Sequence, residues 1–233
     1  MSVIGIITAR GGSKRIPRKN IKSFCGKPII AYTIEAAIQS GVFDEVMVST
    51  DDPKIADVAK EYGASIPFMR SADNSGDLAT TADVLKEVIV EYRKQGKEFD
   101  VFCCLYPTAP FITPQKLRDA MDEFDKSDCD SLITVVRYGF PPQRALLIEN
   151  GFLRYQYPEN EKKRSQDLEP IYHDCGQFYL CKTASFEEYN SLLAGKTVPF
   201  IIPEEEVQDI DTVSDWRIAE AKYRVMHDWR EDV

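Results

Sequence analysis

Short apolar runs alternate with amphipathic segments along most of the chain, and this alternation predicts the fold class. The apolar runs have the length and composition of buried strands, and they are Val3–Thr8, Glu45–Thr50, Ser65–Phe68, Phe99–Leu105 and Ser131–Arg137. The amphipathic segments have the helical period, and they are Pro28–Ser40, Asp52 to about Tyr62, Thr80–Gln95 and Thr113 to about Lys126. This rhythm is typical of an α/β fold with a doubly wound, mainly parallel sheet.

One segment interrupts the rhythm. Residues 138–172 are rich in Pro, Arg, Gln and aromatic residues, and they include Asn150-Gly151, a dipeptide that favours a hairpin turn between short strands. We predict an insertion, either a lid or a dimer contact, within one domain spanning residues 1–233. The alternation then resumes with a strand, a helix, a strand and a final helix: Gly176–Cys181, about Ser185–Ala194, Val198–Pro203 and about Thr212–Asp228.

The loops at one edge of the predicted sheet form the expected functional site. In doubly wound sheets, ligands bind beyond the carboxyl ends of the strands. The loops in question therefore begin after Thr8, Thr50, Leu105 and Arg137.

Composition and charge narrow the function further. The 233 residues are 43% hydrophobic and 29% charged, as in a globular protein, and no apolar run is long enough to span a membrane. A net charge of −9 argues against a nucleic-acid binder. Six cysteines without a C-x-x-C pair, and an N-terminus without the features of a secretory signal, predict reduced thiols in a cytoplasmic protein.

The basic residues are concentrated at the start of the chain. Residues 1–34 contain no Asp or Glu. A basic segment in an acidic protein predicts a site for a small, highly charged anion, and the alternative is a solvated basic loop. The seven basic residues of the segment are Arg10, Lys14, Arg15, Arg18, Lys19, Lys22 and Lys27.

The loop Arg10–Lys14 follows the first predicted strand and is the first candidate site. Gly11 and Gly12 allow a tight turn that brings backbone N–H groups close to a ligand, Ser13 adds a hydroxyl and the flanking residues add cations. This combination predicts a triphosphate cradle, although neither the Walker A nor the dinucleotide motif is present. The alternative is a glycine turn with solvent-facing lysines.

Asp209 and Asp211 are the second candidate site. In an extended segment, residues i and i+2 share one face, so both carboxylates can point at one cation. Hard oxygen ligands of this kind suit Mg²⁺ held jointly with phosphates. The alternative is local: Asp211 or Thr212 caps the final helix, with Asp215 completing a capping box.

Five separated segments resemble the cytidylyltransferases that activate sialic acids. The resemblance covers nearly the whole chain, in the family's order. The segments are Ala9–Lys14 with Ile16–Asn20, Phe43–Glu45 with Val48–Asp52, Pro107–Pro110, Arg164–Leu168 and Asp209–Thr212. The resemblance implies a Rossmann-like fold, Mg²⁺ dependence and usually a homodimer. It also implies a reaction in which CMP is transferred from CTP to a nine-carbon 2-keto sugar acid and pyrophosphate is released.

The resemblance also implies roles for particular residues. The CTP-binding residues would be Arg10, Gly11, Gly12, Ser13, Lys14, Asn20, Arg70, Asp77, Pro107 and Thr108. Asp209 and Asp211 would bind the metal, and with Arg10 and Lys19 would support catalysis by stabilising the charge on the leaving pyrophosphate. Arg164 would bind the sugar carboxylate, with Gln166 beside it. No enzyme nucleophile is needed.

The segment Tyr172–Tyr179 departs from the sialic acid enzymes and resembles the subgroup that uses pseudaminic acid. His173 stands where an arginine is frequent, and Tyr106 replaces the glutamine that usually precedes the P-T-[SA]-P loop. His173, Asp174 and Gln177 are expected to contact the sugar, and the alternative is a structural hydrogen-bond network. N-acetylneuraminate, legionaminate and ketodeoxyoctonate remain alternative substrates. A non-catalytic nucleotide- or sugar-binding module is the alternative of another class, and the use of the product, in flagellin glycosylation or a surface polysaccharide, stays open.

Overall fold

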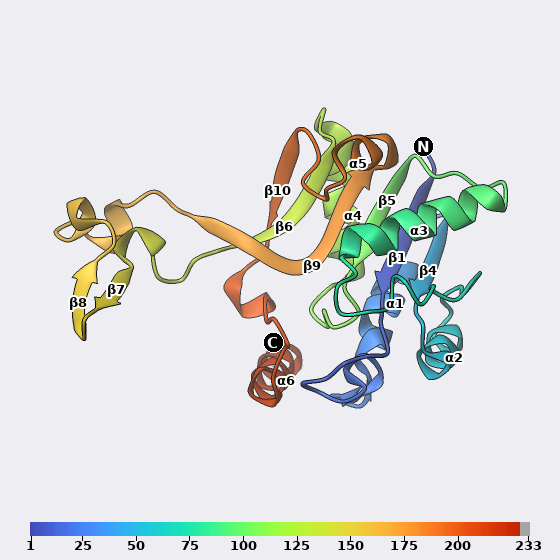
Figure 1. The fold of residues 1–233 in the computed structure, drawn as a ribbon, viewed down its shortest axis with the longest axis horizontal. Helices are drawn as coiled ribbons and strands as arrows, with labels where there is room; N and C mark the ends of the chain where they lie inside the picture. The colour runs from blue at the N-terminus through green and yellow to red at the C-terminus, as the bar shows by residue number, and fades with distance from the viewer. Residues whose placement is uncertain (229–233) are drawn as a thin grey trace.

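A six-stranded sheet forms the centre of the computed structural model, which describes residues 1–228 (Figure 1). In the sheet order β10-β6-β9-β5-β1-β4, five strands run parallel and β9 runs antiparallel between β5 and β6. The predicted α/β fold with a mainly parallel sheet is thereby confirmed. The strands are β1 (Val3–Thr8), β4 (Glu45–Ser49), β5 (Val101–Leu105), β6 (Ser131–Arg137), β9 (Tyr172–Lys182) and β10 (Thr197–Ile201).

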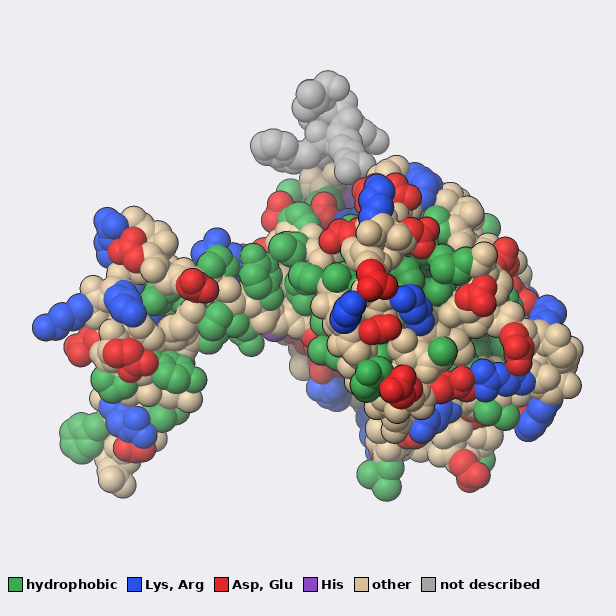
Figure 2. All heavy atoms as spheres, turned by 90° about the horizontal axis from the view of Figure 1, so that it is seen from above, with side chains coloured by type: hydrophobic (Ala, Val, Ile, Leu, Met, Phe, Trp, Pro, Cys, Tyr) green, Lys and Arg blue, Asp and Glu red, His purple; other side chains and the backbone are tan. Residues whose placement is uncertain are grey.

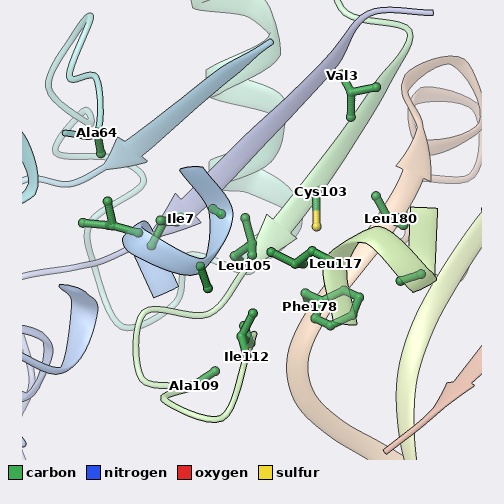
Figure 3. Packing of buried hydrophobic residues seen from close by; sticks show 14 of the residues in the cluster. Val3, Ile7, Ala64, Cys103, Leu105, Ala109, Ile112, Leu117, Phe178 and Leu180 are labelled. Atoms are coloured by element: carbon green, nitrogen blue, oxygen red, sulfur yellow. The ribbon is translucent and has the colours of Figure 1, made fainter. Parts of the chain in front are cut away.

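Helices cover both faces of the sheet. On one face, α1 (Ile29–Ser40), α2 (Pro53–Glu61) and α4 (Pro114–Lys126) bury a cluster that includes Cys103 and Phe178, as Figure 3 shows. On the other face, α3 (Thr81–Lys94) and α5 (Thr183–Tyr189) pack over Cys104 and its neighbours. The adjacent Cys103 and Cys104 thus point to opposite faces, as expected for neighbours on a strand, and all six cysteines are free thiols.

Local sequence signals set the helix boundaries. The Asp52 carboxylate accepts a hydrogen bond from the Lys54 N–H and caps α2, and Thr80 forms a capping box with Asp83 at the start of α3. At the end of α1, Gly41 takes the left-handed conformation at φ 70°. These caps explain why the predicted helices of the first half match the observed ones.

Several predicted elements differ from the structure. The predicted strand Gly176–Cys181 is part of the longer β9, and the strand predicted at Val198–Pro203 is β10, which ends at Ile201. Ser65–Phe68 is not a strand, because only Ser65 pairs with the sheet edge, through a single bridge to Met47. The helix expected near Ser185–Ala194 instead spans Thr183–Tyr189 and ends at Asn190, which adopts φ 53°. The final helix α6 (Val213–Asp228) begins one residue later than predicted, and no described helix has the length and apolar character that crossing a membrane requires.

The insertion at residues 138–172 extends away from the body as an arm (Figures 1 and 2). At its tip, β7 (Leu146–Glu149) and β8 (Phe152–Tyr155) form the predicted hairpin, with both turn residues, Asn150 and Gly151, at positive φ. Apolar side chains along the arm are exposed in this single chain, among them Phe140, Ile148, Phe152 and Leu153.

The helix α6 lies beside the carboxyl edge of the sheet. Trp216 of α6 is buried against Phe24, and the His227 ring stacks on that of Tyr223, so both side chains have packing roles. Trp229 lies outside the described residues.

Candidate active site

A cavity of about 520 Å³ lies at the carboxyl ends of β1 and β5, at the edge that the sequence predicts as functional. Five cationic side chains and two carboxylates line it, so its walls are strongly positive. We call it the cationic cavity. Its predicted site residues are Arg10, Ser13, Lys14, Lys19, Asn20, Arg70, Asp77, Pro107, Thr108 and Asp211.

The two loops at the entrance of the cationic cavity are joined by one carboxylate. Asp77 accepts a hydrogen bond from Arg10 Nη1 at 3.2 Å and also pairs with Lys14. The hydrogen bond and charge of Lys14, together with Arg10, lower the pKa of Asp77. All three side chains are largely exposed, so solvent screens these ion pairs and an incoming polyanion can compete for both cations.

Lys19 lies deeper in the cavity. Its side chain is 21% exposed, and its Nζ donates to the Ile210 carbonyl at 2.6 Å and lies 3.7 Å from Asp211 Oδ1. Burial lowers its pKa, and the charges of Asp211 and Asp209 oppose that shift. The neighbouring Asn20 is also buried, and its amide donates to the Arg10 carbonyl at 2.9 Å, which ties the end of the loop to its start.

The glycines do not behave as predicted. Neither Gly11 nor Gly12 lines the cationic cavity. The Gly11 N–H donates to Asp51 Oδ1 at 2.8 Å, so it is already engaged within the protein. A Cβ on Gly11 would lie 2.8 Å from the Cβ of Asp52, whereas one on Gly12 would meet nothing within 4 Å. Close packing on the start of α2 is therefore the reason for Gly11.

Arg70 forms part of the cavity floor. Its guanidinium is buried and donates to the Ser49 hydroxyl at 3.0 Å and the Ser49 carbonyl at 2.6 Å. Both bonds fix the plane of the guanidinium against the end of β4, and burial lowers its pKa. A preoriented cation of this kind binds a phosphate or a ribose oxygen without reorganising.

A second cavity, of about 530 Å³, adjoins the first, and Tyr106 and Thr108 line both. It lies between β9 and the segment that leads into α6. The predicted sugar contacts among its lining residues are His173, Asp174 and Gln177.

An irregularity in β9 shapes this second cavity. The pairing of β9 with β6 slips between Ile133 and Val135, and Gly176 adopts φ 61° at that point. The bulge lets the Asp174 carboxylate accept hydrogen bonds from the Gly176 N–H and the buried Tyr179 hydroxyl, each at 2.8 Å. Burial, with the nearby Tyr106 and Asp174, raises the pKa of Tyr179, so its hydroxyl remains a donor.

The other two predicted sugar contacts also have partners within the protein. His173 is exposed, and its Nδ1 lies 2.9 Å from the Asp174 carbonyl. The buried Gln177 uses its amide nitrogen to donate to the Glu206 carbonyl at 2.6 Å. Part of the structural hydrogen-bond network expected as an alternative is therefore present.

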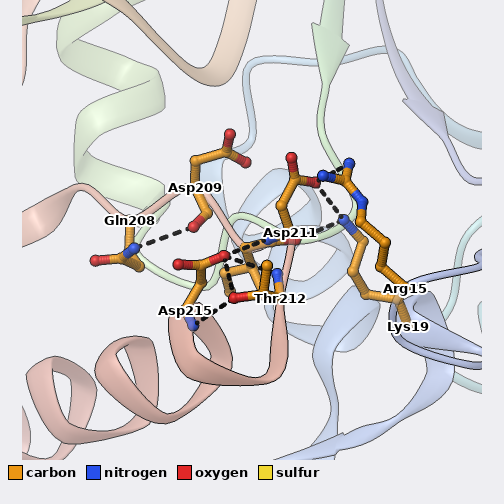
Figure 4. A network of polar contacts seen from close by, with 8 residues as sticks. Arg15, Lys19, Gln208, Asp209, Asp211, Thr212 and Asp215 are labelled. Carbon is orange, nitrogen blue, oxygen red and sulfur yellow. Dashed lines mark hydrogen bonds and ion pairs between the residues drawn. The ribbon is translucent and has the colours of Figure 1, made fainter. Parts of the chain in front are cut away.

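Asp209 and Asp211 stand on the irregular segment before α6 (Figure 4). Asp211 lines the cationic cavity and Asp209 lines the second cavity. Thr212 and Asp215 together form the capping box, so the local alternative holds for Thr212 but not for Asp211. The Asp211 carboxylate instead pairs with Arg15 at 2.8 Å. The helix cap thus leaves both the Asp209 and Asp211 carboxylates available at the cavities.

These carboxylates suit a divalent cation only if other ligands join them. Both supply hard oxygen atoms, and no ion pair or hydrogen bond within the described chain engages the Asp209 carboxylate. No cluster of three or more His, Cys, Asp or Glu side chains among residues 1–228 could hold a metal alone. The donor set therefore fits Mg²⁺ shared with substrate phosphates rather than a closed protein site.

Arg164 and Gln166 are not brought to the second cavity in this chain. Both lie on the arm, where Arg164 forms a bidentate pair with Asp167 at 2.9 and 3.0 Å. Gln166 lines a separate hollow at the base of the arm, which Arg137 and Glu204 also line. Their assignment to the sugar stays a prediction.

Sequence reasoning missed several residues of the site. Arg15 belongs to the basic segment, and its pairing with Asp211 is a role that its position in the sequence does not indicate. Tyr179 and Lys222 line the second cavity and were not singled out. Lys222 comes from α6, 45 positions beyond Gln177 along the chain, so only the tertiary structure brings it to the site.

Comparison with known proteins agrees with this geometry. A sequence model of the cytidylyltransferase family matches residues 4–188. The chain is 40% identical over 229 residues to a pseudaminic acid cytidylyltransferase of Campylobacter jejuni, covering 98% of this chain and 99% of the relative. It is 35% identical over 227 residues to a CMP-N,N'-diacetyllegionaminic acid synthase of Legionella pneumophila, covering 94% and 95%. A solved CMP:2-keto-3-deoxy-manno-octonic acid synthetase shares the fold, with a TM-score of 0.71 at 19% identity, covering 97% of this chain and 100% of that one.

The fold, the cationic cavity and these matches define a nucleotidyltransferase. More particularly, the chain belongs to the cytidylyltransferase family.

Proposed function

We propose that the protein transfers CMP from CTP to the anomeric hydroxyl of pseudaminic acid and releases pyrophosphate. The observation that carries this proposal is the pair of adjoining cavities, one rich in cations and one lined by hydrogen-bonding groups. The first suits a triphosphate and the second a polyhydroxylated sugar. The identity of 40% to a pseudaminic acid cytidylyltransferase over nearly the full length of both chains supports the choice of sugar.

In this mechanism, the cavity walls hold the two reacting groups next to each other. The sugar hydroxyl oxygen attacks the α-phosphorus of CTP and forms a new P–O bond, the bond from the α-phosphorus to the oxygen of the β-phosphate breaks, and the hydroxyl proton passes to solvent. Arg10, Lys14 and Lys19 stabilise the negative charge that grows on the departing pyrophosphate. Because no covalent intermediate with the enzyme is needed, the main contributions are alignment and electrostatics.

We further propose that Asp209 and Asp211 hold Mg²⁺ together with the phosphates. When bound, Mg²⁺ would neutralise phosphate charge and lower the pKa of the attacking hydroxyl. Arg15 and Lys19, which face Asp211, would then keep that carboxylate oriented between the two cavities. Omission of Mg²⁺ is expected to abolish pyrophosphate release, and its addition back to restore it.

We also propose a homodimer in which the arms make the contact. The exposed apolar residues of the arm support this, because Ile148 and Phe152 are 76% and 78% exposed in the single chain. Ile148→Asp with Phe152→Asp is expected to give monomers in sedimentation analysis. Wild-type protein that is itself monomeric at micromolar concentration would contradict the proposal.

The reaction is tested by pyrophosphate release from CTP and Mg²⁺ with four acids in parallel. These are pseudaminic, N,N'-diacetyllegionaminic, N-acetylneuraminic and ketodeoxyoctonic acid. We expect release with pseudaminic acid at a kcat/KM at least tenfold above that of the others. Release with another acid alone would change the sugar and keep the reaction, while CTP binding without release from any acid would indicate a non-catalytic module.

A further inference from the structure

The turn that precedes Asp209 and Asp211 is bound by side chains from three separate elements. It consists of the short 3-10 helix η5 (Glu204–Glu206) and Val207, and it connects β10 to the segment leading into α6. We call it the acidic turn. Residues 207–212 form no regular secondary structure, so backbone pairing alone does not fix the position of the two carboxylates.

Lys222 of α6 binds the acidic turn at both ends. Its Nζ donates to the Val207 carbonyl at 2.7 Å and to the Glu204 carbonyl at 3.2 Å. The Glu204 carbonyl also accepts the Val207 N–H at 3.2 Å, the bond that closes the 3-10 helix, whereas the Val207 carbonyl lies beyond the helix. The ammonium group therefore closes the turn two residues before Asp209.

Gln177 and Lys116 bind the middle of the acidic turn. The Gln177 amide donates to the Glu206 carbonyl at 2.6 Å, and Lys116 Nζ lies 2.5 Å from Glu206 Oε2 and 2.7 Å from the Phe111 carbonyl. All of these groups are shielded from water, because Gln177 is 3% exposed and the Lys116 and Glu206 side chains are 15% and 23% exposed. The shielded, charge-assisted bonds of Lys116 hold their geometry better than exposed ion pairs.

The same contacts join the acidic turn to the wall of the second cavity. Gln177 belongs to the bulge of β9, and its carbonyl accepts a hydrogen bond from the Tyr106 N–H at 2.9 Å. Tyr106 in turn lines both cavities. The turn, the bulge and the border between the cavities are thus connected through one residue, Gln177, by its side-chain amide and its backbone carbonyl.

We propose that Lys116, Gln177 and Lys222 are positioning residues that hold the acidic turn and so place the Asp209 and Asp211 carboxylates for a divalent cation. This proposal rests on the proposed function in one respect, the binding of a divalent cation by Asp209 and Asp211. It changes the expected role of Gln177, whose amide donor serves the turn rather than the sugar. Positioning partners of metal ligands commonly alter metal affinity by about 10- to 100-fold when removed.

The test uses Lys222→Met and Gln177→Leu, which remove the donors while keeping similar side-chain volume. Arg217→Met is the matched control, because Arg217 is an exposed cation on the same helix as Lys222 and lines neither cavity. Two readouts are needed. Hydrogen–deuterium exchange of the peptide covering residues 204–212 reports the turn, and Mn²⁺ titration of the CTP complex, followed by electron paramagnetic resonance, reports the metal site.

We expect each variant to speed exchange in residues 204–212 by about tenfold or more, with the α3 peptide unchanged, and to weaken Mn²⁺ binding by about 10- to 100-fold. Unchanged exchange or unchanged Mn²⁺ affinity in folded variants would overturn the proposal. A raised KM for the sugar acid with normal Mn²⁺ affinity would also overturn it and make Gln177 a direct sugar contact. If Gln177→Leu does not fold, Glu206→Gln removes the carboxylate that pairs with Lys116 and tests that second contact of the turn with the same two readouts.

Neither readout requires turnover or the sugar acid. Failure of the proposed reaction therefore shows as an absence of pyrophosphate release from wild-type protein, whereas failure of the positioning proposal shows as variants that match wild type in exchange or Mn²⁺ binding.

Discussion

Replacing Asp211 by asparagine should separate catalysis from stability. Asparagine keeps the size of the side chain but removes the charge that faces Arg15 and Lys19. The Arg15 pair is largely exposed, with side chains 66% and 38% accessible, so its loss should lower the free energy of unfolding by less than about 1 kcal/mol. The proposed metal site should lose one of its two carboxylates, and the rate should fall by about 10²-fold or more.

The capping box supplies the matched control, because its members lie next to Asp211 and act on the helix. Thr212 Oγ1 accepts from the Asp215 N–H, so Thr212→Ala removes the cap of α6. This should destabilise the protein by about 1 kcal/mol, or about 2–4 °C in Tm for a chain of this size, and leave the rate within a few-fold of wild type. Asp211→Asn should therefore lose rate but little stability, whereas Thr212→Ala should lose stability but little rate.

The assay is pyrophosphate release at saturating CTP and sugar acid with varied Mg²⁺, combined with thermal unfolding of the same preparations. For Asp211→Asn we expect a lower kcat, a higher Mg²⁺ requirement and a nearly unchanged Tm. A wild-type rate in folded Asp211→Asn protein would refute the assignment of this carboxylate to the metal. A rate loss in Thr212→Ala as large as that in Asp211→Asn would show that the order of the segment, rather than the carboxylate, limits the reaction.

Three further predictions concern single side chains. Because burial lowers the pKa of Lys19, its ammonium is lost at a lower pH than that of a free lysine, so kcat/KM should fall on the alkaline side; Lys19→Arg should move that fall to higher pH, as measured by a pH–rate profile. Burial favours a raised pKa for Glu45, but hydrogen bonds from Tyr92, Lys97 and Ser65 outweigh it and the pKa is lowered. The stabilisation by the ionised Glu45 is present above its unfolded-state pKa and is lost as the pH falls through its folded-state pKa. The free energy of unfolding of Glu45→Gln, measured with urea, should therefore depend less on pH below about 5 than that of wild type. Gly11→Ala should destabilise the protein by about 1–3 kcal/mol, because its Cβ would strike Asp52, while Gly12→Ala should cost little; equal melting temperatures for the two variants would contradict this account.

The fold was largely predictable because its signals are local. Strand-length apolar runs and capping residues such as Asp52, Thr80 and Gly41 act over a few positions, and each produced the element expected. Ser65–Phe68 failed because a strand at the sheet edge needs a partner along its whole length, and only Ser65 meets β4. Periodicity carries no information about such pairing.

The sequence by itself determined which charged groups the candidate site contains: a basic segment free of acids around the first strand, and two aspartates at i and i+2 before the last helix. Charge and motif order are properties of the chain: the charge pattern predicted a cationic site for a triphosphate, and the resemblance carried by the motifs implied that this triphosphate is CTP. The tertiary structure alone decided which of the polar groups remain available to a ligand and which are engaged within the protein. It directed the Gly11 N–H to Asp51, assigned the helix cap to Thr212 rather than Asp211, and tied Gln177 to the acidic turn. A hydrogen-bonding group engages whichever partner the fold places within about 3 Å, and partners far apart in sequence cannot be read from its own position.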